Sequence, residues 1–152
     1  MQFTHFTDYS LRTLIYLGAQ QNMLVTINDV AEKYGISQSH LTKVVHQLAS
    51  RGYIQTTRGK GGGMRLARLP QLINIGDVVR DMEENINLVE CFNAKKQGCP
   101  LIPTCILKSV LAEASKNFFA TLDRYTLADL LTNQSSLKKI PELQKSAHSS
   151  PY

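Results

Sequence analysis

Residues 26–68 read "TINDVAEKYGISQSHLTKVVHQLASRGYIQTTRGKGGGMRLAR", and they carry the strongest local signals for the fold. Thr26 is a helix start signal, because its side-chain oxygen can accept a hydrogen bond from a free amide of the first helical turn. The pattern predicts a short helix over 27–34, a turn at Gly35 that suits a helix C-cap, and a second helix over 38–50. This arrangement is typical of a helix-turn-helix.

The second predicted helix has two chemically different sides. One side is an apolar stripe that a core would bury, with residues at i, i+3, i+4 and i+7. The other faces carry short hydrogen-bonding groups and one cation, which suit base edges in a major groove about 12 Å wide. The DNA contacts predicted here are Ser37, Gln38, Ser39, His40 and Lys43. A helical hairpin in an all-helical core is the alternative that the turn alone leaves open.

The segment that follows predicts a β-hairpin. Alternating residues over 53–57 are followed by a glycine cluster and then by "MRLAR" over 64–68. A basic hairpin directly after a helix-turn-helix is a wing, and its cations can contact phosphates. The predicted contacts are Arg58, Lys60 and Arg65. A nucleotide-binding glycine loop is disfavoured, because Gly61 stands where a Walker-type loop needs Ser or Thr and Met64 replaces the last glycine of a dinucleotide fingerprint.

Charge is distributed unevenly along the chain. The 152 residues carry a net charge of +5, and residues 33–76 contain seven basic residues and no acidic one. Such asymmetry favours a polyanionic partner, here double-stranded DNA. An ordinary solvated basic face is the alternative.

The composition also bears on the compartment. No apolar run approaches the roughly 18 residues that a membrane span needs. Three cysteines cannot all pair within one chain, and a reducing cytosol keeps cysteines as thiols or metal ligands. We therefore expect a cytoplasmic protein with no membrane partner.

The rest of the chain predicts three longer helices and a tail. The first helix opens near Thr7 and Asp8, and the second spans 75–84. The third, over 106–125, has apolar residues spaced by four and three, a packing seam close to heptad spacing. Its apolar surface exceeds what one small head can cover, which favours a homodimer over a monomer with a long core helix.

The predicted fold is therefore mainly α, with a winged helix-turn-helix head and a two-stranded β wing. The predicted parts are a DNA-binding domain over 1–84, a cysteine loop over 85–105, a dimerisation helix region over 106–131 and a polar flexible tail over 132–152.

All three cysteines of the chain lie in the linker before the long helix, at Cys91, Cys99 and Cys105. Their spacings, C-x7-C and C-x5-C, match neither the paired C-x2-C of structural zinc sites nor the four cysteines of ordinary ferredoxins. From spacing alone, an iron–sulfur cluster, zinc, thiol redox sensing and inert cysteines all stay open. A cysteine-nucleophile enzyme is disfavoured, because none of the four histidines shows a recognisable partner pattern.

Several motifs taken together resemble the winged-helix repressors that sense through iron–sulfur clusters. They are "FTDYSLRTLIYL" over 6–17, the wing, "IGDVVRDME" over 75–83, the three-cysteine linker and "YTLADL" over 125–130. The resemblance covers roughly residues 1–131, and within the family it is greatest to the nitric-oxide-sensitive repressors.

This resemblance implies a dimeric repressor, not an enzyme, with one 4Fe-4S or 2Fe-2S cluster per subunit held by Cys91, Cys99 and Cys105. A sister group that regulates cluster biogenesis has a histidine ligand where this chain has Lys108, whose ammonium cannot bind iron while protonated. The resemblance implies Asp8, reaching the cluster of the other subunit, as fourth ligand. A purely helix-stabilising role of Asp8 is the alternative, and His5 and Glu90 are lesser candidates for the fourth ligand.

The resemblance also implies a signal. Nitric oxide acting on the cluster would release operator DNA. A regulator that responds to iron–sulfur status, or to zinc or thiol redox chemistry, is the alternative.

Overall fold

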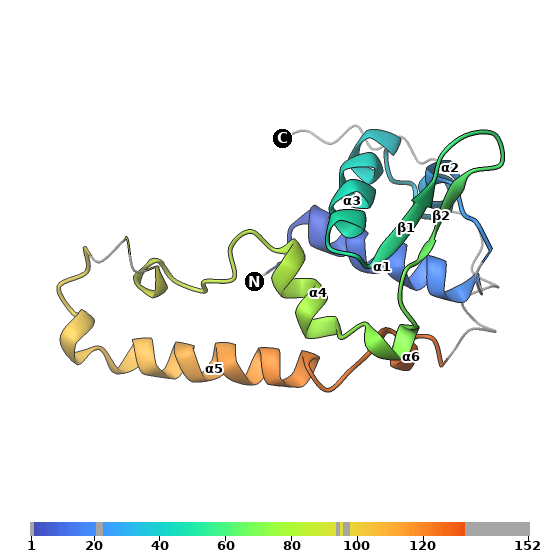
Figure 1. Ribbon diagram of the computed structural model, residues 1–152. Coiled ribbons are helices and arrows are strands. Elements are labelled where there is room, and N and C mark those ends of the chain that lie inside the picture. Colours follow the sequence, from blue (N-terminus) through green and yellow to red (C-terminus); the bar gives the residue numbers. More distant parts are fainter. Residues whose placement is uncertain (1, 21–22, 94, 96–97, 133–152) are drawn as a thin grey trace.

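The computed structural model describes residues 2–20, 23–93, 95 and 98–132. The head contains α1 (His5–Ala19), α2 (Ile27–Tyr34), α3 (Gln38–Ser50), β1 (Ile54–Thr57), β2 (Gly63–Leu66), η1 (Pro70–Leu72) and α4 (Ile75–Met82). After it come η2 (Glu90–Phe92), η3 (Ile102–Thr104), α5 (Ile106–Leu122) and α6 (Leu127–Leu130). Figure 1 shows an arm, formed by the linker and α5, that extends away from the head. The predicted tail lies outside the described residues from 133 onward.

The helix-turn-helix forms where its local signals predict. Thr26 and Asp29 make a reciprocal capping box at the start of α2, and Gly35 ends the helix with a left-handed φ of 65°. Ser37 caps α3 by accepting a hydrogen bond from the His40 amide at 3.4 Å. The predicted bounds of α2 and α3 are confirmed.

Three other helix bounds differ from the prediction, and one of them is the end of α5, which lies at Leu122 rather than at 125. α1 begins at His5 rather than near Thr7, because the Thr4 hydroxyl accepts a hydrogen bond from the Thr7 amide and caps the helix earlier. α4 ends at Met82 rather than at 84, since Glu83 adopts an extended backbone. The Glu83 carboxylate instead accepts a hydrogen bond from the Thr7 hydroxyl at 2.6 Å and so ties α4 to the start of α1.

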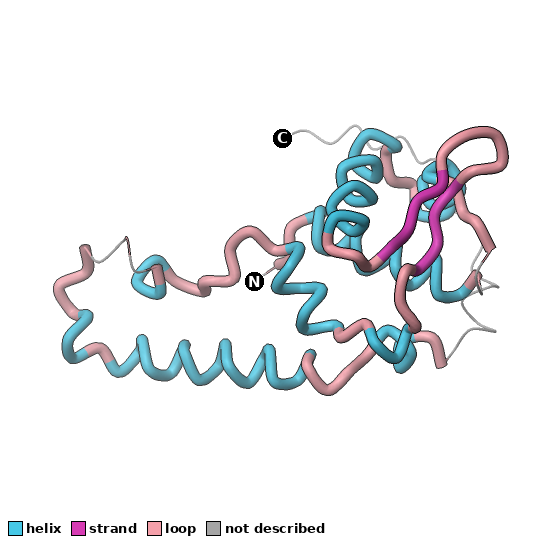
Figure 2. Tube along the Cα trace, viewed as in Figure 1, coloured by secondary structure: helices cyan, strands magenta, loops and turns pink. Residues whose placement is uncertain are grey.

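The wing is a two-stranded antiparallel hairpin, as predicted. β1 pairs with β2 in the register Ile54↔Leu66 to Thr57↔Gly63, and Figure 2 shows the strands and their connecting loop at the edge of the head. The loop turns through Gly59 and Gly61, whose φ angles of 97° and 79° favour glycine.

The core of the head lies between α1, α3, α4 and the base of the wing. It includes the fully buried Leu14, Leu41, Val44, Leu48 and Val78. After α5 the chain returns to the head, where Leu127 and Leu131 are also buried. The end of the described chain therefore packs on the head rather than on the arm.

Candidate DNA interface and cysteine loop

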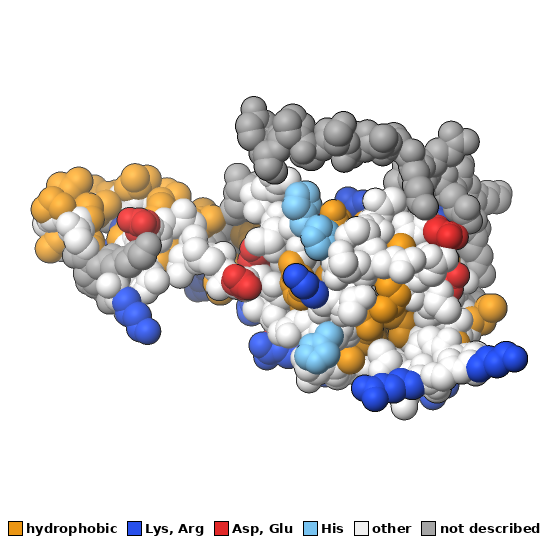
Figure 3. All heavy atoms as spheres, turned by 90° about the horizontal axis from the view of Figure 1, so that it is seen from above, with side chains coloured by type: hydrophobic (Ala, Val, Ile, Leu, Met, Phe, Trp, Pro, Cys, Tyr) orange, Lys and Arg blue, Asp and Glu red, His pale blue; other side chains and the backbone are white. Residues whose placement is uncertain are grey.

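The outer face of α3 presents the side chains that the sequence predicts for base contact. Ser37, Gln38, Ser39, His40 and Lys43 are all exposed. The apolar side of the helix, from Leu41 to Leu48, is buried. In Figure 3, which views the head from above, Lys, Arg and His side chains are spread over this face and the visible acidic side chains lie toward its edges.

Three of these side chains have hydrogen-bond partners within the head. Gln38 Nε2 donates to Asn28 Oδ1 at 2.7 Å, and Asn28 Nδ2 in turn donates to Glu32 Oε1 at 2.9 Å. The Ser37 hydroxyl lies 3.3 Å from that of Ser39 as well as capping α3. Asn28 therefore orients Gln38 before any DNA contact. No local pattern signals this role, because the two residues lie on different helices.

His40 faces α1 at the start of α3. Its ring centroid lies 6.3 Å from that of Tyr9, which stacks on His5 at 5.6 Å. The imidazole is exposed, so it can reach a ligand while one side of its ring remains near α1.

The predicted wing cations are exposed, and a fourth basic residue, Arg68, is also exposed but is bonded to the head. Arg58, Lys60 and Arg65 all lie on the hairpin surface. Arg68 instead donates to the Gly52 and Arg51 carbonyls at 2.8 and 2.7 Å, and its guanidinium lies 4.8 Å from the centroid of the Tyr53 ring. Arg68 thus fixes the wing to the end of α3, where the carbonyls lack helical partners.

A buried phenol links the wing to α4. The Tyr53 hydroxyl donates to Asp81 Oδ2 at 2.6 Å, and Arg51 forms an ion pair with the same carboxylate at 3.4 Å. Burial, with the hydrogen bond to Asp81 as a further cause, raises the pKa of Tyr53 well above its usual range. The phenol therefore stays protonated and remains a donor at neutral pH.

The three cysteines lie on the linker between α4 and α5, and all are free thiols. Cys91 belongs to η2, Cys99 is exposed, and Cys105 immediately precedes α5. Within the described residues, no three His, Cys, Asp or Glu side chains converge closely enough to hold a metal ion. The donor set fits an iron–sulfur cluster or zinc, because both take cysteine thiolates.

Asp8 lies in the head, on α1, and Figure 1 shows the cysteine loop at the far end of the arm. Its carboxylate forms an ion pair with Arg12 at 2.8 Å and accepts a hydrogen bond from Arg12 Nε at 3.0 Å. The pair lines a hollow of about 640 Å³ beside Tyr9 and Tyr34. Within one subunit, the structure does not bring Asp8 and the cysteines together.

No helix in the described part of the chain is both long and apolar enough to cross a membrane.

Comparison with known proteins gives a family and several relatives. The family model described as "Rrf2: Iron-dependent Transcriptional regulator" matches residues 3–133. The HTH-type transcriptional regulator NsrR of Bacillus licheniformis is 49% identical over 141 residues, which cover 92% of this chain and 99% of that protein. Its namesake in Bacillus subtilis is 47% identical over 146 residues, covering 95% and 100%.

Solved structures show the same fold. IscR of T. potens superposes with a TM-score of 0.70 at 25% identity and covers 94% of both chains. CymR, the global cysteine regulator of B. subtilis, gives a TM-score of 0.68 at 23% identity and covers 86% of this chain and 95% of that one.

Proposed function

The chain belongs to the Rrf2 family of iron-dependent transcriptional regulators, and we propose that it is a dimeric repressor that releases operator DNA in response to nitric oxide. It is a DNA-binding transcriptional repressor and not an enzyme. The observation that carries the nitric-oxide proposal is the identity of 47–49% to regulators named NsrR over almost the whole chain. We place the protein in the cytoplasm, where its operators lie.

The exposed face of α3 is proposed to enter the major groove. Ser39 and Lys43 are exposed there, and Gln38 can exchange its hydrogen bond with Asn28 for one with a base edge. The wing cations Arg58, Lys60 and Arg65 would contact phosphates, which position the head without reading sequence. Two heads related by two-fold symmetry fit half-sites about 34–36 Å apart.

A second copy is proposed to cover α5. This helix contains no buried residue in the described structure, and its first turns expose Ile106 by 79%, Leu107 by 62% and Val110 by 54%. An exposed apolar helix face of this kind favours association. A homodimer through α5 would bury it and would join two DNA-reading heads.

Cys91, Cys99 and Cys105 are proposed to hold the cluster, a 4Fe-4S or 2Fe-2S group, one per subunit. When bound, the cluster would supply iron that reacts with nitric oxide. In the described residues of the cysteine linker, the regular structure consists of two short 3-10 turns, η2 and η3. Drawing its thiols together therefore costs mainly loop entropy, which grows slowly with loop length.

Asp8 of the partner subunit is the proposed fourth ligand. To bind, its carboxylate must leave Arg12. Both side chains are partly exposed, at 39% and 43%, and exposed pairs of this kind contribute only about 0–1 kcal/mol. Arg12 is therefore a weak competitor for Asp8.

The test uses anaerobically purified protein and an operator selected by that protein from random DNA. We expect visible charge-transfer bands that bleach on titration with nitric oxide, with operator binding, followed by fluorescence anisotropy, lost in step. A protein that stays colourless after reconstitution, yet binds the operator tightly and ignores nitric oxide, would show a zinc- or thiol-dependent regulator instead.

Replacing Lys60 by alanine is expected to weaken binding to all DNA sequences. Loss of one phosphate contact makes the negative slope of log K against log salt shallower by about 0.9. If affinity at 1 M salt is unchanged, affinity at 0.1 M salt then falls roughly eightfold. The measurement is anisotropy over a salt series. The control is Arg124→Ala, an exposed cation just after α5, and Figure 1 shows the end of α5 on the side of the molecule away from the wing loop. An unchanged slope in Lys60→Ala would remove Lys60 from the phosphate contacts.

A further inference from the structure

The joint between the head and the arm is held by a two-pronged ion pair. Arg80, on α4, donates from Nη1 and Nη2 to the two carboxylate oxygens of Asp123, just after α5, and both distances are 2.7 Å. The guanidinium also lies 4.7 Å from the centroid of the Phe119 ring. A forked pair that also stacks on a ring fixes orientation as well as distance. These three residues are the joint clamp.

Hydrogen bonds to two backbone carbonyls hold the same two elements together. Asn74 Nδ2 donates to the Asp123 carbonyl at 2.7 Å, and the Ile75 amide donates to the Tyr125 carbonyl at 3.0 Å. A Cβ added at Gly76 would lie 1.9 Å from Asp123 Oδ1, so only glycine leaves room for the carboxylate. The end of α5 is therefore seated directly on the first turn of α4.

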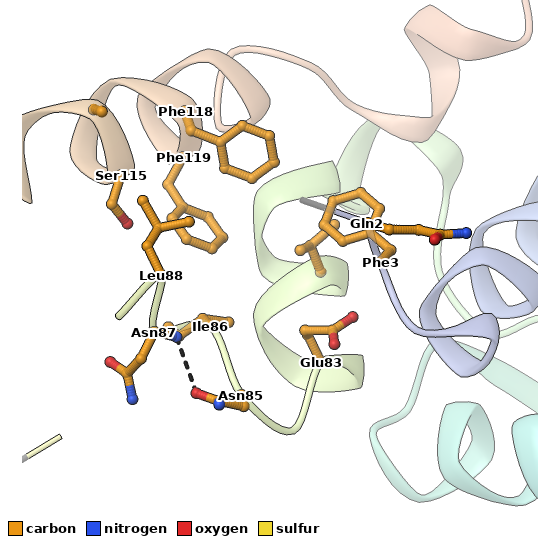
Figure 4. A pocket seen from close by; sticks show the side chains of 12 residues that line it. Gln2, Phe3, Glu83, Asn85, Ile86, Asn87, Leu88, Ser115, Phe118 and Phe119 are labelled. Atoms are coloured by element: carbon orange, nitrogen blue, oxygen red, sulfur yellow. Dashed lines mark hydrogen bonds between the residues drawn. The ribbon is translucent and has the colours of Figure 1, made fainter. Parts of the chain in front are cut away.

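The other flank of the joint is hollow. A cavity of about 430 Å³ is lined by residues of α4, of the segment after it and of α5. Figure 4 shows Phe118, Phe119 and Leu88 on one side of this space, with Phe3 and Glu83 on the other. The Phe3 and Phe118 rings still meet, with centroids 6.0 Å apart. Since packing on this flank is incomplete, the contacts that hold the end of α5 against α4 are concentrated at the clamp and at the hydrogen bonds beside it.

The clamp stays charged at neutral pH. The hydrogen bonds from Arg80 lower the pKa of the Asp123 carboxyl below its usual value. The two side chains are 36% and 42% exposed, and exposed ion pairs contribute little to folding stability. Its geometry, rather than its contribution to stability, is therefore the property to test.

We propose that the clamp of Arg80, Asp123 and Phe119 sets the angle between the DNA-reading head and the dimerisation arm, and so selects the half-site spacing that the dimer accepts. This inference rests on the proposed function, in which two heads are joined through α5. Because α3 lies at a distance from the joint, a small tilt of the head at the joint displaces α3. In a two-fold dimer the tilt occurs twice, so the separation of the two recognition helices changes by both displacements.

The test compares DNA with two half-sites and DNA with one. The probes are a duplex selected from random DNA by the wild-type protein and the same duplex with one half-site replaced by unrelated sequence. Asp123→Asn keeps the size of the side chain but removes the charge and one of its two acceptor oxygens. We expect its affinity for the two-half-site duplex to fall about fivefold or more. Affinity for the single half-site should change by less than twofold. The variant should also show a smaller difference in affinity between duplexes with the selected spacing and duplexes with altered spacing.

The matched control is Asp77→Asn. Asp77 pairs with the same Arg80 at 3.3 Å, but both residues lie on α4, so this pair does not cross the joint. The control should leave both affinities within twofold of wild type. Arg80→Lys keeps the charge without the fork and should give a smaller loss, confined to the two-half-site duplex.

Two outcomes would overturn the proposal. Asp123→Asn and Arg80→Lys could both bind the two duplexes with wild-type affinity and wild-type spacing preference, or both could lose affinity equally for the two duplexes. A wild-type protein that binds one half-site as tightly as two would instead refute the dimeric operator binding on which the inference rests. That comparison separates the two failures.

Discussion

Replacing Cys99 by serine is expected to abolish the response to nitric oxide and to weaken operator binding about 5- to 150-fold, the usual range for coupling between two sites. Cys99 is the exposed member of the three thiols, so serine should fit without disturbing the core. A serine hydroxyl is a harder and poorer ligand for iron–sulfur chemistry than a thiolate. The measurements are the visible spectrum and operator anisotropy, each with and without nitric oxide.

Thr104→Ala is the control for this prediction, because Thr104 is exposed in the same loop, directly before Cys105. It should retain the spectrum and the response. Asp8→Ala tests the fourth ligand in the same assay, and unchanged operator affinity and nitric-oxide response would remove Asp8 from the ligand set. A Cys99→Ser protein with wild-type bands and release would refute the three-cysteine site.

Replacing Leu48 by alanine should lower the free energy of unfolding by about 2–5 kcal/mol. Leu48 is 0% exposed and lies on the apolar side of α3, so the shortened side chain loses transfer free energy and leaves a cavity in the head. Urea unfolding followed by circular dichroism at a fixed protein concentration measures the change, since the stability of a dimer depends on concentration.

Leu72→Ala is the control for the core prediction. Leu72 is 67% exposed at η1, so its truncation should change the free energy of unfolding by no more than about 0.5 kcal/mol. If Leu48→Ala shifted the unfolding midpoint no further than Leu72→Ala does, then α3 would not be packed through Leu48.

Much of the candidate site was accessible from the sequence, because the relevant signals are local. The capping residues at Thr26, Gly35 and Ser37 act within one helical turn, and they place α2 and α3 at their predicted bounds. Apolar periodicity then separates the buried side of α3 from its exposed side. The predicted contacts with DNA and with a cluster still await the experiments above.

Other features depended on contacts between distant residues. Arg68 is one of the basic residues of the head, but its guanidinium lies over the Tyr53 ring and donates a hydrogen bond at the end of α3. Arg68 therefore stabilises the head. Asn28 meets Gln38 across two helices, and Glu83 meets Thr7 across 76 positions of sequence. No short-range pattern contains these pairs.

The helix-turn-helix, the wing and the grouping of the three thiols on one linker could be predicted from the sequence, because caps, turns and side-chain periodicity act over a few residues. The way in which the arm meets the head could not be predicted in this manner. Arg80 and Asp123 lie 43 positions apart, and their fork forms because α4 and the end of α5 are packed together with Gly76 leaving room between them. Such a contact depends on the packing of whole elements, which no local pattern records.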